Sequence, residues 1–108
     1  MAIYIWAMFK NASLPWTLST GEQALRQNGF AIMDPAAGPN VHVLGHRSNP
    51  DVDVTVVCQR LGRNPTSVVI HAISPDGNAA RGAMETVRDH IKRTVSLEGD
   101  VVENPVHE

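Results

Sequence analysis

Three histidines and one aspartate carry the chemistry that is most worth testing in this sequence. His42, His46 and Asp53 fall in two neighbouring valine-rich runs, and His71 falls in a third. Imidazole and carboxylate groups bind divalent transition metals, and they also act as general acids and bases. In one extended strand, however, His42 and His46 would lie about 13 Å apart at ~3.3 Å per residue.

The ligands of a metal site must lie closer together than this spacing allows. Zinc sites use three or four ligands, whereas only His46 and Asp53 are expected to be adjacent across a strand pair. The pattern therefore favours a solvated or partner-binding sheet face, and no cofactor is predicted. A metal- or anion-dependent enzyme that uses the His42/His46/Asp53 face, with His71 as a further ligand, is the alternative.

Other signatures of catalysis are missing from the sequence. It has no nucleophile elbow, no phosphate-binding loop, no His-Glu-x-x-His motif and no paired-cysteine motif. The single cysteine, Cys58, excludes an intrachain disulfide and is expected to be a small buried hydrophobic residue. An enzymatic function is therefore less favoured than a binding function.

The histidines need a scaffold, and residues 41–74 predict a three-stranded antiparallel meander. Its three runs are rich in valine, isoleucine and threonine, which suit a pleated and half-buried surface. Asn49-Pro50-Asp51 is a turn signal between the first two runs. If Arg47 pairs with Val52, one face of this pair is apolar and the other is mixed.

The predicted register assigns each side chain to a face. The inner face is expected to hold the residues Val41, Val43, Gly45, Val54, Val56 and Cys58, and from the third run Val68, Ile70 and Ala72. The outer face is expected to hold the pairs His46 with Asp53, Leu44 with Thr55, and His42 with Val57. A shift of one residue would invert every side chain.

Helices and one further strand are expected to complete the domain. Residues 3–9 alternate but are apolar on both faces, so this N-terminal strand has no determined place in the sheet. Ser19 and Glu22 have the spacing of a capping box, which predicts a first helix from there to Asn28-Gly29, with a short strand considered over 30–33. Apolar residues three and four apart predict a second helix over about 78–94, capped by Ser74 or Asp76.

These elements predict a single α+β domain over residues 1–95. It contains an antiparallel sheet of about four strands, the meander at 41–74 plus the N-terminal strand, with two helices packed on one face. Residues 96–108 are acidic, contain Gly99 and Pro105, and are expected to form a flexible C-terminal tail.

Composition narrows the function further. The chain has 108 residues, 43% hydrophobic and 19% charged, as expected for one folded domain. Its net charge of −2 gives no general attraction to nucleic acid or to an anionic membrane. No apolar run reaches the ~18 residues of a membrane span, and no signal peptide is evident, so a cytoplasmic location is expected. A secreted protein whose signal peptide has been removed is the alternative.

Surplus apolar residues favour a protein partner. Tyr4, Trp6, Met8, Trp16 and Leu44 exceed what one small core with two helices would cover. Exposed apolar surface usually marks an interaction site, and closed two-fold dimers are the commonest assembly. We therefore expect a small binding or regulatory domain that contacts a protein or a second copy of itself, as a homodimer that involves the N-terminal strand. If that strand is central in the sheet, its two covered faces need no dimer.

Overall fold

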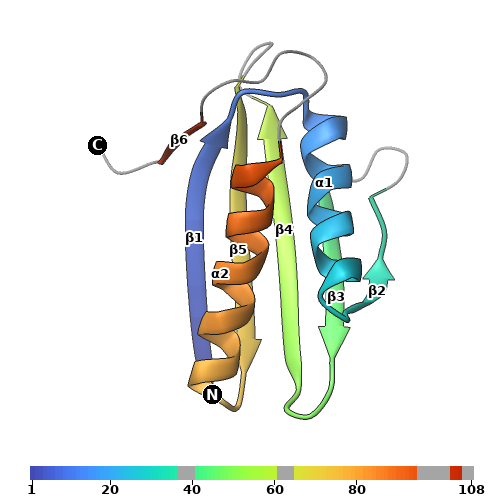
Figure 1. The fold of residues 1–108 in the computed structure, drawn as a ribbon, viewed down its shortest axis with the longest axis vertical. Helices are drawn as coiled ribbons and strands as arrows, with labels where there is room; N and C mark the ends of the chain where they lie inside the picture. Colours follow the sequence, from blue (N-terminus) through green and yellow to red (C-terminus); the bar gives the residue numbers. More distant parts are fainter. Residues whose placement is uncertain (37–40, 61–64, 95–102, 106–108) are drawn as a thin grey trace.

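The computed structural model describes residues 1–36, 41–60, 65–94 and 103–105, the last of these as backbone only. Two helices cover one face of an antiparallel sheet, which makes a two-layer α+β fold (Figure 1). The elements in chain order are β1 (Ala2–Lys10), α1 (Leu14–Gln27), β2 (Ala31–Asp34), β3 (His42–Arg47), β4 (Val52–Arg60), β5 (Thr66–Ser74), α2 (Gly77–Arg93) and β6 (Glu103–Pro105).

The meander has the predicted register. Arg47 pairs with Val52, and His46 pairs with Asp53. The residues expected on the inner face of the β3, β4 and β5 strands are buried against the helices, while their neighbours are at least partly exposed. Val41 was also expected on the inner face, but it precedes β3 and is 46% exposed. Its carbonyl accepts a hydrogen bond from the Cys58 N–H at 2.7 Å.

The N-terminal strand joins the sheet beside β5, the last strand of the meander. The strand order is β2-β3-β4-β5-β1-β6, and β1 pairs with β5 over its whole length, from Ala2 with Ser74 to Lys10 with Thr66. On its other side, and within the described part of the chain, β1 pairs only at Met8–Lys10, with the three residues of β6. Among the described residues, the first two-thirds of β1 therefore form an edge of the sheet.

The start of α1 corrects the sequence-based expectation. The helix begins at Leu14, five residues before the predicted Ser19, because Ser13 is the N-cap and its side chain accepts from Trp16 N at 3.3 Å. Pro15 lies in the first turn, where a missing N–H has no cost. Glu22 therefore does not cap the helix. It accepts instead from the Ala36 N–H at 2.7 Å, and this hydrogen bond, opposed by burial and aided by Arg26, lowers the pKa of Glu22.

The other helix boundaries follow the predicted signals. Gly29 adopts a positive φ of 81° just after the end of α1, and Phe30 N–H returns to the Leu25 carbonyl. Asp76 caps α2 by accepting from the Asn78 and Ala79 N–H groups. In the predicted tail, residues 103–105 form β6, and the other tail residues after 95 lie outside the described residues.

One core lies between the helices and the sheet. Its fully buried side chains come from every layer: Met8 from β1, Leu25 from α1, Val43 from β3, Val54 and Val56 from β4, Ile70 from β5, and Val87 and Ile91 from α2. The predicted contact of the last helix with the meander is therefore confirmed. No helix among the described residues is both long and apolar enough to cross a membrane.

Candidate functional site

The face of the sheet opposite the helices is the main candidate site, and we call it the outer sheet face. Strand residues alternate between faces, so the outward positions follow from the buried ones. The outer sheet face consists of Ile3, Ile5, Ala7 and Phe9 of β1, Ser67, Val69, His71 and Ile73 of β5, Asp53, Thr55, Val57 and Gln59 of β4, and His42, Leu44 and His46 of β3.

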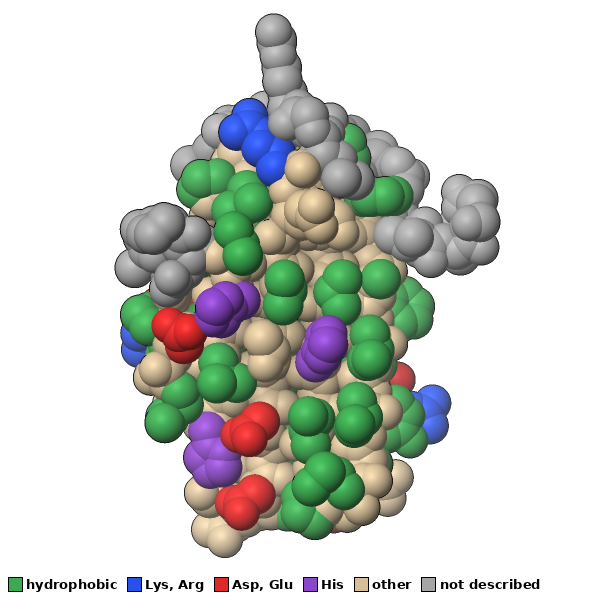
Figure 2. All heavy atoms as spheres, turned by 180° about the vertical axis from the view of Figure 1, so that it is seen from behind, with side chains coloured by type: hydrophobic (Ala, Val, Ile, Leu, Met, Phe, Trp, Pro, Cys, Tyr) green, Lys and Arg blue, Asp and Glu red, His purple; other side chains and the backbone are tan. Residues whose placement is uncertain are grey.

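Cross-strand pairing orders this surface into rows. The middle row runs Ile5, His71, Thr55 and Leu44 across the four strands. The row on one side runs Ile3, Ile73, Asp53 and His46, and the row on the other side runs Ala7, Val69, Val57 and His42. The β1 and β5 half is therefore mainly apolar apart from His71, whereas His42, His46 and Asp53 lie on β3 and β4; Figure 2 shows the hydrophobic side chains gathered on one side of this face.

Two isoleucines on this face are unusually open to solvent. Ile3 is 58% exposed and Ile5 is 57% exposed. Sheet faces that meet only water normally carry polar side chains at these positions. Neighbouring large apolar side chains that stay exposed instead indicate a surface that contacts a partner.

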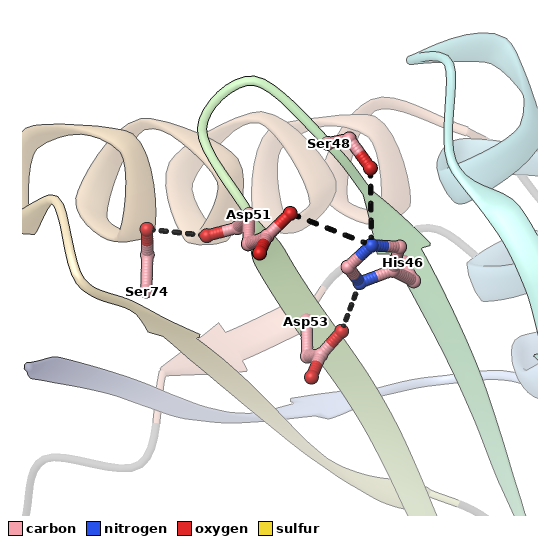
Figure 3. Close-up of polar contacts among 5 residues, drawn as sticks. All are labelled: His46, Ser48, Asp51, Asp53 and Ser74. Carbon is pink, nitrogen blue, oxygen red and sulfur yellow. Dashed lines mark hydrogen bonds and ion pairs between the residues drawn. The ribbon is translucent and has the colours of Figure 1, made fainter.

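The predicted histidines form two separate pairs with carboxylates. His46 Nδ1 lies 2.6 Å from Asp53 Oδ1, as the register predicted (Figure 3). His42 Nε2 lies 2.5 Å from Oδ2 of Asp34, a partner that the sequence reasoning missed. The pairing of β2 with β3 brings Asp34 beside His42, and the short β2 strand was the only sequence signal for it.

A hairpin network surrounds His46. Its Nε2 atom lies 3.3 Å from Ser48 Oγ and 3.8 Å from Asp51 Oδ1 (Figure 3). The Asp51 carbonyl in turn accepts from Ser74 Oγ at 2.6 Å, which joins the β3–β4 turn to the end of β5. The Ser74 hydroxyl therefore holds this turn against the end of β5, and His46 contacts the same turn from β3.

The same network has the order of hydrogen bonds found in a serine–histidine–carboxylate relay. In such a relay the carboxylate orients the imidazole, and the imidazole takes the proton of the hydroxyl. Here all members lie open to water, with the His46 side chain 37% exposed and that of Asp53 58% exposed. Serine nucleophiles normally act in a site with reduced access to water, which strengthens the electrostatic interactions inside it.

The predicted metal-ligand set does not converge. His42, His46 and His71 lie in three different rows of the outer sheet face, and only His46 adjoins Asp53. Among the residues that the structure describes, no group of three or more histidine, cysteine, aspartate or glutamate side chains is arranged to hold a metal ion.

The five predicted interface residues do not share one surface. Met8 is 1% exposed and belongs to the core, because the even-numbered residues of β1 face the helices. Trp6 lies under Arg88, whose guanidinium is 4.7 Å from the ring centroid, and Trp16 lies near Lys10. Tyr4 is on the helix side as well, although it is partly exposed. Only Leu44 lies on the outer sheet face.

Three basic residues lie over aromatic rings rather than on the outer sheet face. No outward strand position named above is a lysine or an arginine. Lys10, Arg47 and Arg88 instead cover aromatic rings between the sheet edges and the helices. The outer sheet face therefore carries no basic side chain that would have to leave water when the face is covered.

Cys58 is buried in the core and is not a reactive thiol. Burial raises the pKa of Cys58 to about 12, so almost no thiolate forms near neutral pH. We expect iodoacetamide to leave the folded chain unmodified at pH 8 and to alkylate Cys58 fully after denaturation. Mass spectrometry measures the difference, and rapid alkylation of the folded chain would contradict this placement of β4.

Comparison with known proteins found no family model, no curated protein and no solved structure that matches this chain. The functional argument therefore rests on the geometry of the outer sheet face and of the His46 network.

Proposed function

We propose that this chain is a small non-enzymatic binding or regulatory domain, and that it acts through protein–protein contacts made by its outer sheet face. The observation that carries the proposal is the exposure of Ile3 and Ile5 on a face without lysine or arginine. Burial of apolar area stabilises an association by roughly 25 cal/mol per Å² before the costs of binding are subtracted. The cytoplasm is the compartment that we propose for it, since its one thiol is buried and unpaired.

Position-resolved photo-crosslinking tests this proposal. A benzophenone amino acid is placed at Ile5 or at Val69 on the outer sheet face, and at Gln23, an exposed residue of α1, as the control. After irradiation in the native host, we expect protein adducts from Ile5 and Val69 and none above background from Gln23. Equal yields from the two faces, or no adducts from either, would overturn the assignment of the binding face.

A hydrolase activity with Ser48 as the nucleophile is the second candidate function. The Ser48–His46–Asp53 arrangement is the observation that favours it. Under this candidate a fluorophosphonate would label Ser48, and the label would disappear in both Ser48→Ala and His46→Ala. Under the binding proposal, the wild-type chain should label no more than Ser48→Ala does. Intact-protein mass spectrometry separates the two results.

A further inference from the structure

We infer that the occupant of the outer sheet face is a second copy of this chain, packed face to face about a two-fold axis that lies between the two sheets. This inference rests on the proposed function, because it names the partner of the same surface. Sheet-on-sheet packing is a standard way to bury two apolar sheet faces, and the layers lie about 10 Å apart.

The size of the face fits a dimer. Three of its strands, β1, β4 and β5, have nine residues each, and β3 has six. With ~3.3 Å per residue and ~4.8 Å between strands, these four strands present about 500 to 700 Å² per copy. Two copies would bury about 1,000 to 1,400 Å², at the lower end of stable interfaces, so we expect dissociation in the micromolar range.

The charges of the face also suit apposition with itself. A surface that meets its own copy places like charges near one another, and uncompensated like charges oppose association. Here the outer sheet face has no lysine or arginine. Its one carboxylate, Asp53, is hydrogen-bonded to His46, and Asp34 beside the face is hydrogen-bonded to His42. Both carboxylates therefore keep a hydrogen-bond partner within their own copy when the face is covered.

The exposed edge of β1 continues the same surface. Residues 2–7 of β1 have no paired strand on their outer side among the described residues. Ile3 and Ile5, the two large exposed apolar side chains of the outer sheet face, both belong to this edge strand. A partner that covers the face therefore also covers the side chains of the edge strand. An edge without charge or proline is otherwise prone to uncontrolled pairing.

The centre of the face is the position that best reports the packing. His71 and Thr55 pair in the middle row, on the two central strands of the outer sheet face. A two-fold axis that lies between the two sheets, over this centre, places His71 near His71 of the second copy. This holds whether the axis is parallel or perpendicular to the strands. Residues of the helix layer are remote from their counterparts in either arrangement.

Light scattering coupled to size exclusion measures the mass first. The wild-type chain at about 50 µM should have twice the 11.7 kDa chain mass and should dissociate on dilution through the micromolar range. Ile5→Glu should weaken the dimer by about tenfold or more, because it buries a carboxylate in the interface. Tyr4→Glu is the matched control on the same strand, and it should remain a dimer because Tyr4 faces the helix side.

Crosslinking supplies a second measurement that does not depend on disrupting the fold. His71→Cys treated with a short bis-maleimide should give a covalent dimer, whereas Gln23→Cys should not. The native Cys58 is buried and does not react in the folded chain. Circular dichroism confirms that each variant is folded.

The outcomes separate this inference from the proposed function. A wild-type monomer at about 50 µM overturns the dimer, as does a dimer that is insensitive to Ile5→Glu and is not crosslinked at His71→Cys. If the same chain still gives adducts with a different protein from Ile5 and Val69, the binding function stands with another partner. If those positions give no adducts at all, both proposals fail.

Discussion

Replacing Ile91 with alanine should lower the free energy of unfolding by about 2 to 5 kcal/mol. Ile91 is fully buried in the last turn of α2, inside the core between this helix and the sheet. Its loss removes apolar burial and leaves a cavity that the surrounding side chains fill only in part. Since a small domain has about 5 to 15 kcal/mol of stability in total, the melting temperature should fall by 10 °C or more.

A graded substitution checks the cause. Ile91→Val removes a single methylene and should cost only about 0.5 to 1.5 kcal/mol. Urea titration followed by circular dichroism measures both variants. A loss below about half a kilocalorie for Ile91→Ala would mean that α2 does not dock on the sheet as described.

Gly21→Leu should destabilise the fold by about 3 kcal/mol or more. Gly21 is a buried residue of α1 at the place where this helix lies closest to β4. A Cβ atom added there would already lie 3.2 Å from Val56 Cγ1, and leucine adds three further carbons. Val56 is fully buried, so the helix would have to move away from the sheet.

Gly82→Leu is the matched control for this substitution. Gly82 lies inside α2, but it is exposed, and a Cβ atom there meets nothing within 4 Å. Because leucine favours a helix more than glycine does, Gly82→Leu should stabilise the chain by about 0.5 to 1 kcal/mol. Thermal unfolding of the two variants should therefore move in opposite directions. A gain for Gly21→Leu similar to that of Gly82→Leu would show that α1 is not tightly packed against β4 at Gly21.

Much of the fold follows from local patterns in the sequence. The meander could be predicted in register because the turn at Asn49-Pro50-Asp51 and the alternation of valines agree with each other. The start of α1 was predicted wrongly because two capping signals compete. Ser13 followed by Pro15 lies six residues before the predicted N-cap at Ser19, and the packing of Leu18 on the core requires the longer helix.

The sequence alone could not predict which face of β1 points into the core. Both sets of alternating residues in this strand are apolar, so periodicity does not say which set faces the core. Pairing with β5 decides it, since Met8 opposite the inward Val68 must point the same way. The exposed isoleucines are consequently the odd-numbered residues, whereas the sequence favoured Tyr4, Trp6 and Met8. Asp34 was missed because the register of β2 against β3 shifts between Ile32 and Asp34, and no local pattern in the sequence predicted that shift.

The pairing of β1 with β5 has a consequence for how the chain is made. Ala2 pairs with Ser74, so β1 has no β5 partner until the chain has been synthesised as far as residue 74. During that interval its apolar side chains, Ile3 and Ile5 among them, have neither sheet nor helix beside them. Long-range strand pairing is slow, and unpaired apolar strands aggregate. The nascent chain is therefore most in need of chaperone protection before residue 74 emerges.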